Sequence, residues 1–187
     1  NYTQLFQDNT FKAAVINTLI LVVVAVPCVT AFSLWVGASI YKMHSFSRSF
    51  FRCVFYLPVV TGSVAITVVW KWILNPYNGI LNQVAGTSGF DWLGNQKTAI
   101  WFIILILFTT SIGQPIVLYV AALGNVDQSL IEAAQVDGAT KLQVFWKIKW
   151  PQIMPTTLYV LVITTINSFQ CFALIQLLTK GGPLNST

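Results

Sequence analysis

Residues 100–120 read IWFIILILFTTSIGQPIVLYV and contain no Asp, Glu, Lys, Arg or His. Thirteen of them are Leu, Ile, Val or Phe, which near the centre of a membrane helix would favour insertion by about 6 kcal/mol. One central Lys would remove about 3 kcal/mol of that gain. Because about 20 apolar residues suffice to cross the hydrocarbon layer, this stretch predicts a membrane-spanning helix.

The same character recurs along the chain, since Asp, Glu, Lys and Arg are absent from residues 13–41, 53–70, 98–126 and 150–179. We therefore predict an all-α fold, a polytopic transmembrane helical bundle formed as a single domain by residues 1–187. Its spans, about four in number, are predicted at residues 13–41, 53–74, 98–123 and 152–179. Kinked helices are expected, because Pro27, Pro58 and Pro115 lie inside these apolar runs.

The composition excludes several other classes of protein. Hydrophobic residues make up 56% of the chain and charged residues 8%, whereas a soluble domain has about 25% charged residues. This balance excludes an ordinary soluble enzyme, a disordered chain and a nucleic-acid-binding domain. The three cysteines form no Cys-x-x-Cys motif and are expected to act as small hydrophobic side chains: Cys28, Cys53 and Cys171.

Basic residues between the predicted spans indicate which helix ends share a side of the membrane. Residues 42–52 (KMHSFSRSFFR) carry three Lys or Arg and no acid, and residues 127–149 carry three Lys. Cytoplasmic loops are enriched in Lys and Arg, so both segments are predicted to be cytoplasmic and both ends of the chain external. The single histidine, His44, lies in the first segment and is expected to be solvated.

The loop between the third and fourth spans, residues 127–151, carries the signals of two short helices. Ser129 and Glu132 fit a capping box at the start of the first helix, with Asp127 as a competing N-cap. Gly138 supplies the positive φ that would end this helix.

A second capping box is predicted at Thr140 and Gln143, and Pro151 is expected to halt the second helix before the next span. Together the two helices would form a compact projection with the small residues Ala133 and Ala134 on its surface. Two interpretations remain open at this point. The projection enters a groove on a partner protein, or it is an amphipathic segment that rests on lipid.

Uncharged polar residues inside the spans are candidates for a translocation pathway. Thr164, Asn167 and Ser168 follow the i, i+3, i+4 spacing of one helical face, and Gln114 directly precedes Pro115. Hydroxyl and amide groups suit a neutral polyol. The alternative is hydrogen bonding between helices near a kink.

Several catalytic chemistries have no support in the sequence. The spans contain no Asp, Glu or His of the kind that proton relays and ion-coupled carriers use. The phosphate-binding motif Gly-x-x-x-x-Gly-Lys-Ser/Thr does not occur, so ATP hydrolysis is not expected in this chain. No metal site and no nucleophile with its base are apparent, and the chain is not expected to be an enzyme.

The loop's spaced pattern resembles the coupling motif of ATP-binding-cassette (ABC) importer permeases, of the carbohydrate type that includes the maltose, glycerol-phosphate and lactose permeases. The residues that carry the resemblance are Glu132, Ala133, Ala134, Asp137, Gly138, Ala139, Ile148 and Pro151. The resemblance extends along the chain through Asn17-Thr18, Leu57-Pro58 and Gly181-Gly182-Pro183.

This resemblance implies that the loop is a coupling helix that docks into an ABC ATPase subunit. Glu132 would make a polar or charged contact, Ala133 and Ala134 a close fit, and Gly138 the turn. It further implies a second permease subunit, an external solute-binding protein, no contact with nucleic acid, and a multi-pass location in a bacterial or archaeal cytoplasmic membrane. No cofactor is implied, because the partner subunit binds ATP.

Some positions depart from the family's pattern: Trp150, Asp127 and Lys180 replace a common Leu, Pro and Gly. The family's first and last helices also have no counterpart, and neither an initiator Met nor a signal peptide is visible at Asn1. We therefore expect the chain to be an excerpt of a longer polypeptide.

The expected function is that of the membrane-spanning subunit of an ATP-driven, binding-protein-dependent importer of a sugar or related polyol. An importer permease for an amino acid, peptide or ion is the principal alternative, and a channel or secondary carrier is a weaker one. The sequence identifies neither the solute nor the partner permease.

Overall fold

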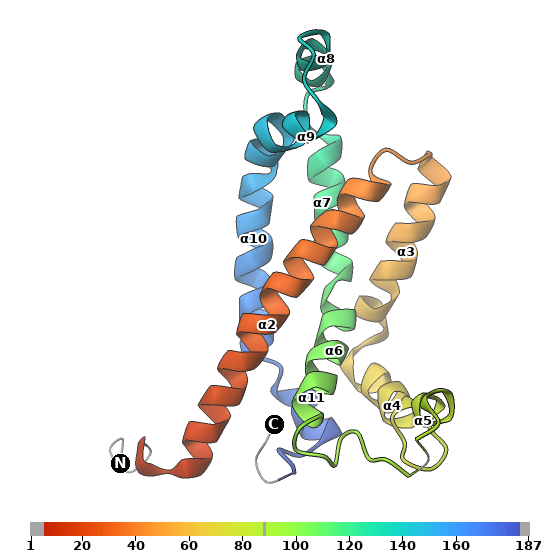
Figure 1. Cartoon of the computed structure of the whole chain (residues 1–187), viewed down its shortest axis with the longest axis vertical. Coiled ribbons are helices and arrows are strands. Elements are labelled where there is room, and N and C mark those ends of the chain that lie inside the picture. The colour runs from red at the N-terminus through yellow and green to blue at the C-terminus, as the bar shows by residue number, and fades with distance from the viewer. Residues whose placement is uncertain (1–5, 88, 184–187) are drawn as a thin grey trace.

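The computed structural model describes residues 6–87 and 89–183, apart from the side chain of Ser63, and every regular element in those residues is helical (Figure 1). The predicted all-α fold is thereby confirmed. In chain order the elements are α2 (Asn9–Ile40), α3 (Ser45–Thr61), α4 (Ser63–Ile73), α5 (Ile80–Ala85), α6 (Ala99–Ser111), α7 (Gly113–Gly124), α8 (Gln128–Val136), α9 (Lys141–Val144), the π-helix η1 (Phe145–Lys149), α10 (Trp150–Phe169) and α11 (Phe172–Leu178).

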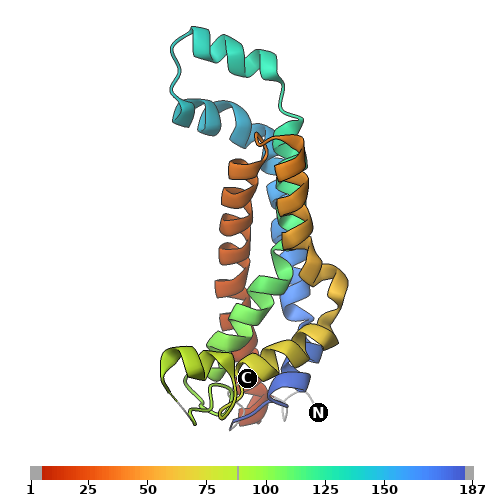
Figure 2. The ribbon, with the colours of Figure 1, turned by 90° about the vertical axis from the view of Figure 1, so that its right-hand side faces the viewer.

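The helices form an elongated bundle in which α2, α3, α7 and α10 run along the long axis (Figures 1 and 2). α8 and α9 project beyond one end, where the turn between α2 and α3 also lies. α4, α5 and α11 lie toward the opposite end. The two basic segments that were predicted to share a side of the membrane therefore do lie at one end of the bundle.

Only α2 among the described helices is by itself long and apolar enough to cross a membrane. Three further candidates are helix pairs bent at a short break, by 101° for α3 and α4, 43° for α6 and α7, and 42° where α10 meets α11. The predicted runs 53–74, 98–123 and 152–179 are therefore broken rather than continuous helices. If each bent pair crosses as one unit, the number of spans is four.

The break between α3 and α4 has its cause in the backbone. Gly62 adopts φ 82° and ψ 148°, a combination that is almost confined to glycine. Pro58, one turn earlier, has no N–H to donate, which weakens the last turn of α3. The chain can therefore turn sharply at Gly62.

The α6–α7 bend lies at Ile112, within one turn before Pro115, where a proline ring displaces the preceding carbonyls. The hydroxyl of Ser33 on α2 donates to the carbonyl of Ile112 at 3.4 Å. Pro27 has no such effect, because α2 is continuous through it. Of the three prolines, only Pro58 and Pro115 therefore lie beside breaks.

Two apolar clusters hold the bundle together. One, nearer α8, contains the fully buried Val29 of α2, Tyr119 of α7 and Ile153 of α10. The other, nearer the opposite end, contains Leu21 of α2 and Ile103 of α6. α2 contributes to both clusters, so it is the helix against which the others are arranged.

The outside of the bundle is also apolar. Large side chains such as Val60, Val68 and Leu158 are more than half exposed. Soluble monomers rarely expose apolar surface so extensively, whereas a helix that faces lipid or another subunit does so without penalty.

A polar loop with a buried centre closes the end opposite α8. In this α5 loop (residues 75–87 and 89–98), the Asn82 amide donates to the carbonyls of Asn75, Pro76 and Phe90 at 3.2, 3.0 and 2.9 Å. Its carbonyl oxygen accepts from Thr87 and from the Trp92 indole, at 2.9 and 2.7 Å. Asn82 is 2% exposed, so one buried amide organises the whole loop.

Candidate functional site

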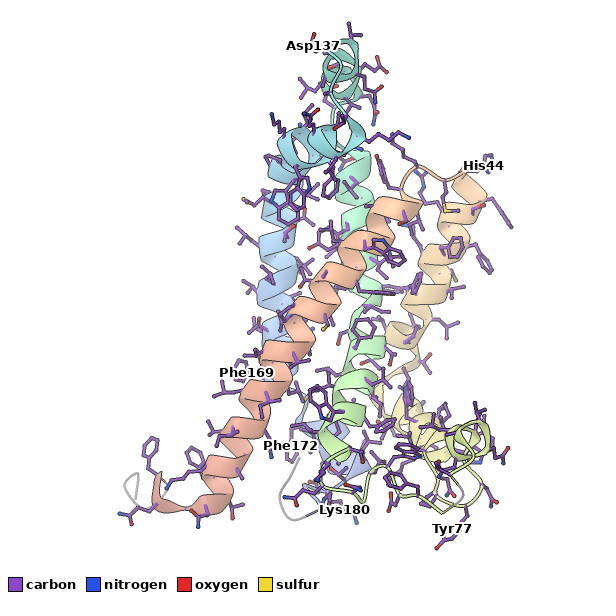
Figure 3. All side chains as sticks on the ribbon, in the orientation of Figure 1. His44, Tyr77, Asp137, Phe169, Phe172 and Lys180 are labelled. Atoms are coloured by element: carbon purple, nitrogen blue, oxygen red, sulfur yellow. The ribbon has the colours of Figure 1, made fainter. Side chains whose placement is uncertain are left out.

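The predicted coupling segment is a helical hairpin at the tip of the bundle, the α8–α9 hairpin (residues 127–144), with Asp137 near its outermost point (Figure 3). α8 begins at Asp127, whose carboxylate accepts from the Ser129 backbone N–H at 2.9 Å. Asp127 rather than Ser129 is thus the N-cap, which suits a helix start because a carboxylate there also interacts favourably with the helix dipole. Hydrogen bonds from the Ser129 hydroxyl and N–H hold the pKa of Asp127 below its ordinary value.

The end of α8 confirms the prediction for Gly138. Its φ is +79°, and it forms a Schellman motif in which Ala139 N–H donates to the Ala134 carbonyl at 2.9 Å and Gly138 N–H to the Gln135 carbonyl at 3.1 Å. A side chain at this position would meet no neighbouring atom within 4 Å, so the constraint is conformational.

The capping box at the start of α9 is confirmed as well. Gln143 N–H donates to Thr140 Oγ1 at 3.3 Å, and Thr140 N–H donates to Gln143 Oε1 at 2.8 Å. Both ends of the hairpin's turn are therefore stabilised by local hydrogen bonds.

The prediction that Pro151 halts the second helix is wrong. The chain stays helical from Lys141 to Phe169, passing through the π-helical turn η1 into α10. Proline lacks an N–H and crowds the carbonyl four residues earlier, and a widened turn just before it accommodates both effects. The hairpin is therefore connected to α10 by continuous helix.

The residues of the predicted coupling motif differ in how far their side chains are exposed. Glu132, Ala133, Asp137, Gly138 and Pro151 are exposed, whereas Ala134, Ala139 and Ile148 are half-buried. A hollow of about 400 Å³ between α8 and η1 is lined by several of them together with neighbouring residues: Ala134, Asp137, Gly138, Ala139, Gln143, Val144, Lys147 and Ile148. Thus part of the motif builds the hairpin and part is available to a partner.

A contact that the sequence did not predict lies where the hairpin joins the bundle. Lys149, the last residue of η1, is 9% exposed and its Nζ donates to the hydroxyl of the buried Tyr41 at the end of α2. The Arg48 guanidinium of α3 donates to the Tyr41 carbonyl at 3.3 Å. Lys149 had been predicted to be a loop charge. No periodic signal connects it to Tyr41, because 108 positions separate them.

The candidate pathway residues of α10 do not all point the same way. Thr164 and Ser168 are buried, at 3% and 1% exposure, whereas Asn167 is exposed. Ser168 lines a cavity of about 320 Å³. Phe169 and Phe172, which also line it, lie on either side of the break between α10 and α11 (Figure 3). Asn17 and Thr18 of α2 and Gln176 of α11 line the same cavity.

Gln114 lies elsewhere, in a groove of about 540 Å³ between α3 and α7. Its neighbours there on α3 are Ser49, Arg52, Cys53 and Tyr56. Gln114 and Ser168 therefore line different hollows within the described part of the chain, and their membership of one pathway stays a prediction.

Comparisons with known proteins agree with this architecture. Residues 6–187 match the family described as the inner membrane component of binding-protein-dependent transport systems. A probable ABC transporter permease protein of Bacillus subtilis, YurN, is 34% identical over 189 residues, covering 98% of this chain and 65% of the relative. The xylose/arabinose import permease protein XacH of Haloferax volcanii is 31% identical over 190 residues, covering 100% of this chain and 60% of the relative.

Solved structures give the same result. A bacterial ABC transporter involved in the import of the acidic polysaccharide alginate has a chain that superposes with a TM-score of 0.83 and 27% identity, covering 99% of this chain and 66% of that chain. The alginate ABC transporter in complex with its alginate pentasaccharide-bound periplasmic protein gives the same TM-score. The chain thus spans less than two thirds of the length of each relative named here.

Proposed function

The chain belongs to the family of inner membrane components of binding-protein-dependent transport systems, and we propose that it forms the membrane-spanning part of an ATP-driven importer. The proposed solute is a sugar or related polyol, in keeping with relatives named for xylose, arabinose and alginate import. The proposed location is the cytoplasmic membrane of a bacterium or archaeon.

The α8–α9 hairpin is the observation that carries the proposal. It projects beyond the bundle, is internally capped and exposes Glu132 and Ala133, while Ile131 and Val144 join it to the core of the bundle. A projecting helix of this kind suits a groove on a cytoplasmic ATPase subunit. A second permease subunit would cover part of the exposed apolar flank, and an external binding protein would deliver the solute. The chain needs no cofactor of its own in this scheme.

Continuous helix from the hairpin to α10 gives the proposed route for mechanical coupling. Movement of α8 by the ATPase would be transmitted through η1 to α10, which carries Thr164, Asn167 and Ser168. Energy is transferred only if the ATPase binds one permease conformation better than the other. Asn167, which is exposed on this chain, would then meet the solute or the second permease.

The coupling role is tested by a pair of substitutions at Gly138 in the assembled transporter. Gly138→Val is expected to leave membrane insertion intact but to uncouple ATP hydrolysis from uptake, because a β-branched residue is strained at φ +79°. Gly138→Asn is the matched control, since Asn tolerates this conformation and should retain uptake. Normal uptake and normal ATPase co-purification in Gly138→Val would contradict the proposal.

The pathway residues are tested separately by solute competition. Asn167→Ala and Gln114→Ala are expected to raise the apparent KM for a sugar several-fold, about what the loss of one or two hydrogen bonds causes. Unchanged affinity in both variants would remove these residues from the pathway. Uptake of an amino acid, peptide or ion instead of a sugar would keep the importer but replace the solute class.

A further inference from the structure

The groove between α3 and α7 contains a cation without a counter-charge. Arg52 lines this groove with Ser49 and Tyr56 on the same face of α3, opposite Gln114. Its Nε is buried and has no hydrogen-bond partner within the described residues. The groove is therefore polar where Arg52 lies, in a surface that is otherwise apolar.

None of the chain's acids can neutralise Arg52. The five acidic residues all lie in other parts of the fold, before α2, in the α5 loop, and in or beside α8: Asp8, Asp91, Asp127, Glu132 and Asp137. Arg48 lies one turn before Arg52, and like charges at i and i+4 repel each other on a helix. Arg48 uses one guanidinium nitrogen for the Tyr41 carbonyl. An external anion in the groove would relieve this repulsion by pairing with the part of the guanidinium that lines the groove.

The position of Arg52 along α3 suggests the source of that anion. It lies seven residues after Ser45, about 10 Å along the helix axis from the end of the bundle that carries α8. The polar zone of a bilayer is about 5–8 Å deep on each side, and a long arginine side chain extends several ångströms toward it. With the α8 end of the bundle at the membrane surface, the guanidinium would therefore reach the level of lipid phosphates, and the apolar Val117 and Leu118 line the same groove.

We propose that the Arg52 groove (Ser49, Arg52, Cys53, Tyr56, Gln114, Val117 and Leu118) binds an anionic phospholipid of the leaflet at the α8 end. The guanidinium holds the phosphate, for which its fork of donors is suited, and Ser49 and Tyr56 offer further hydroxyl donors. The acyl chain lies along Val117 and Leu118. The proposal requires that this groove face lipid, so a raised KM for the solute in Gln114→Ala would place the groove on the solute pathway and overturn it.

Lipid retention tests this proposal without any ATPase or solute. The transporter is purified into nanodiscs that contain phosphatidylglycerol and phosphatidylcholine, and the lipid that stays bound is counted by native mass spectrometry. Arg52→Gln is expected to weaken phosphatidylglycerol retention about fivefold, the contribution of one basic residue near an anionic surface. Arg52→Lys should retain part of the binding, and Lys71→Gln, an exposed cation of α4 at the opposite end, should retain all of it.

Thiol labelling gives a second measurement that needs no substitution at Arg52. Cys53 lines the groove and is exposed, and Cys28 on α2 is an exposed internal control. Phosphatidylglycerol, but not phosphatidylcholine, is expected to slow maleimide labelling of Cys53 and to leave Cys28 unchanged. Equal labelling of Cys53 in both lipids, or wild-type retention in Arg52→Gln, overturns the proposal. Displacement of the lipid by millimolar inorganic phosphate overturns the lipid assignment, because the groove would then select soluble anions.

Discussion

The two polar loops at opposite ends of the bundle are built in contrasting ways. The α5 loop closes on the buried amide of Asn82, which reaches three carbonyls, a hydroxyl and an indole. The α8–α9 hairpin is held by hydrogen bonds between residues at most five positions apart, and most of its surface is exposed. The α5 loop buries its polar centre, whereas the hairpin leaves most of its residues exposed.

This difference predicts where the chain is stable by itself. Amides of the α5 loop near Asn82 are expected to exchange slowly with solvent, because their loop has a buried centre. Amides of α8 are expected to exchange quickly until the proposed ATPase subunit binds, since Ile131 is the one buried residue of this nine-residue helix. The following substitutions test this difference between the α5 loop and the α8–α9 hairpin, beginning with the largest expected effect.

Asn82→Ala is expected to destabilise the protein by about 3 kcal/mol, because it leaves several buried hydrogen-bonding groups without a partner. Thermal unfolding in detergent, followed by Trp fluorescence, measures the loss. The neighbouring exposed Gln83→Ala is the matched control and should change little. If the two variants unfolded alike, the α5 loop would not depend on its buried amide.

Tyr41→Phe is expected to lower stability by about 2 kcal/mol, because it removes the hydroxyl that accepts from the buried Lys149 ammonium. The double variant Tyr41→Phe with Lys149→Met removes both partners and should recover most of that loss. Unfolding of the single and double variants under one set of conditions measures the coupling. Additive losses of stability would show that the junction between the hairpin and the bundle does not depend on the Tyr41–Lys149 pair.

Thr140→Ala is expected to weaken the start of α9 by about 1 kcal/mol, the usual effect of losing a side-chain N-cap. Hydrogen exchange should rise across residues 140–144 while the unfolding temperature of the bundle stays nearly constant. Ser39→Ala, which removes a hydroxyl bonded within α2, is the control. A large fall in the unfolding temperature would mean that the hairpin is part of the bundle's cooperative core.

The smallest effect is expected from pH at Asp127. The pKa of its carboxylate is lowered by folding, so its cap contributes fully above the unfolded-state pKa and is lost as pH falls through the folded-state pKa. Hydrogen exchange in the first turn of α8 should therefore rise in acid. Asp127→Asn, a neutral N-cap, should abolish this pH dependence, and persistence of the dependence would assign it to another group.

Sequence patterns predicted features that depend on near neighbours. Gly138 and the Thr140–Gln143 box are found as predicted, because helix ends are determined by residues within one turn of each other. The competition between Asp127 and Ser129 for the first cap was recognisable in sequence, and the structure decides it for Asp127.

Predictions that depended on contacts between residues distant in the sequence were less accurate. The predicted spans are interrupted at Gly62, Ile112 and the α10–α11 break. Pro151 is accommodated within a helix rather than ending one, because η1 widens the turn before it. The predicted polar face of α10 is divided between buried Ser168 and exposed Asn167, since α10 packs against α2 and α7.

By itself, the sequence determined that this chain is a helical membrane protein and that residues 127–151 carry the signals of two short helices, because charge distribution and helix capping are local properties. Only the tertiary structure decided which polar groups are paired. Asn82 is surrounded by five partners, Lys149 reaches Tyr41, and Arg52 remains without a counter-charge. Pairing of this kind depends on which helices pack together, and no spacing along the chain encodes that arrangement.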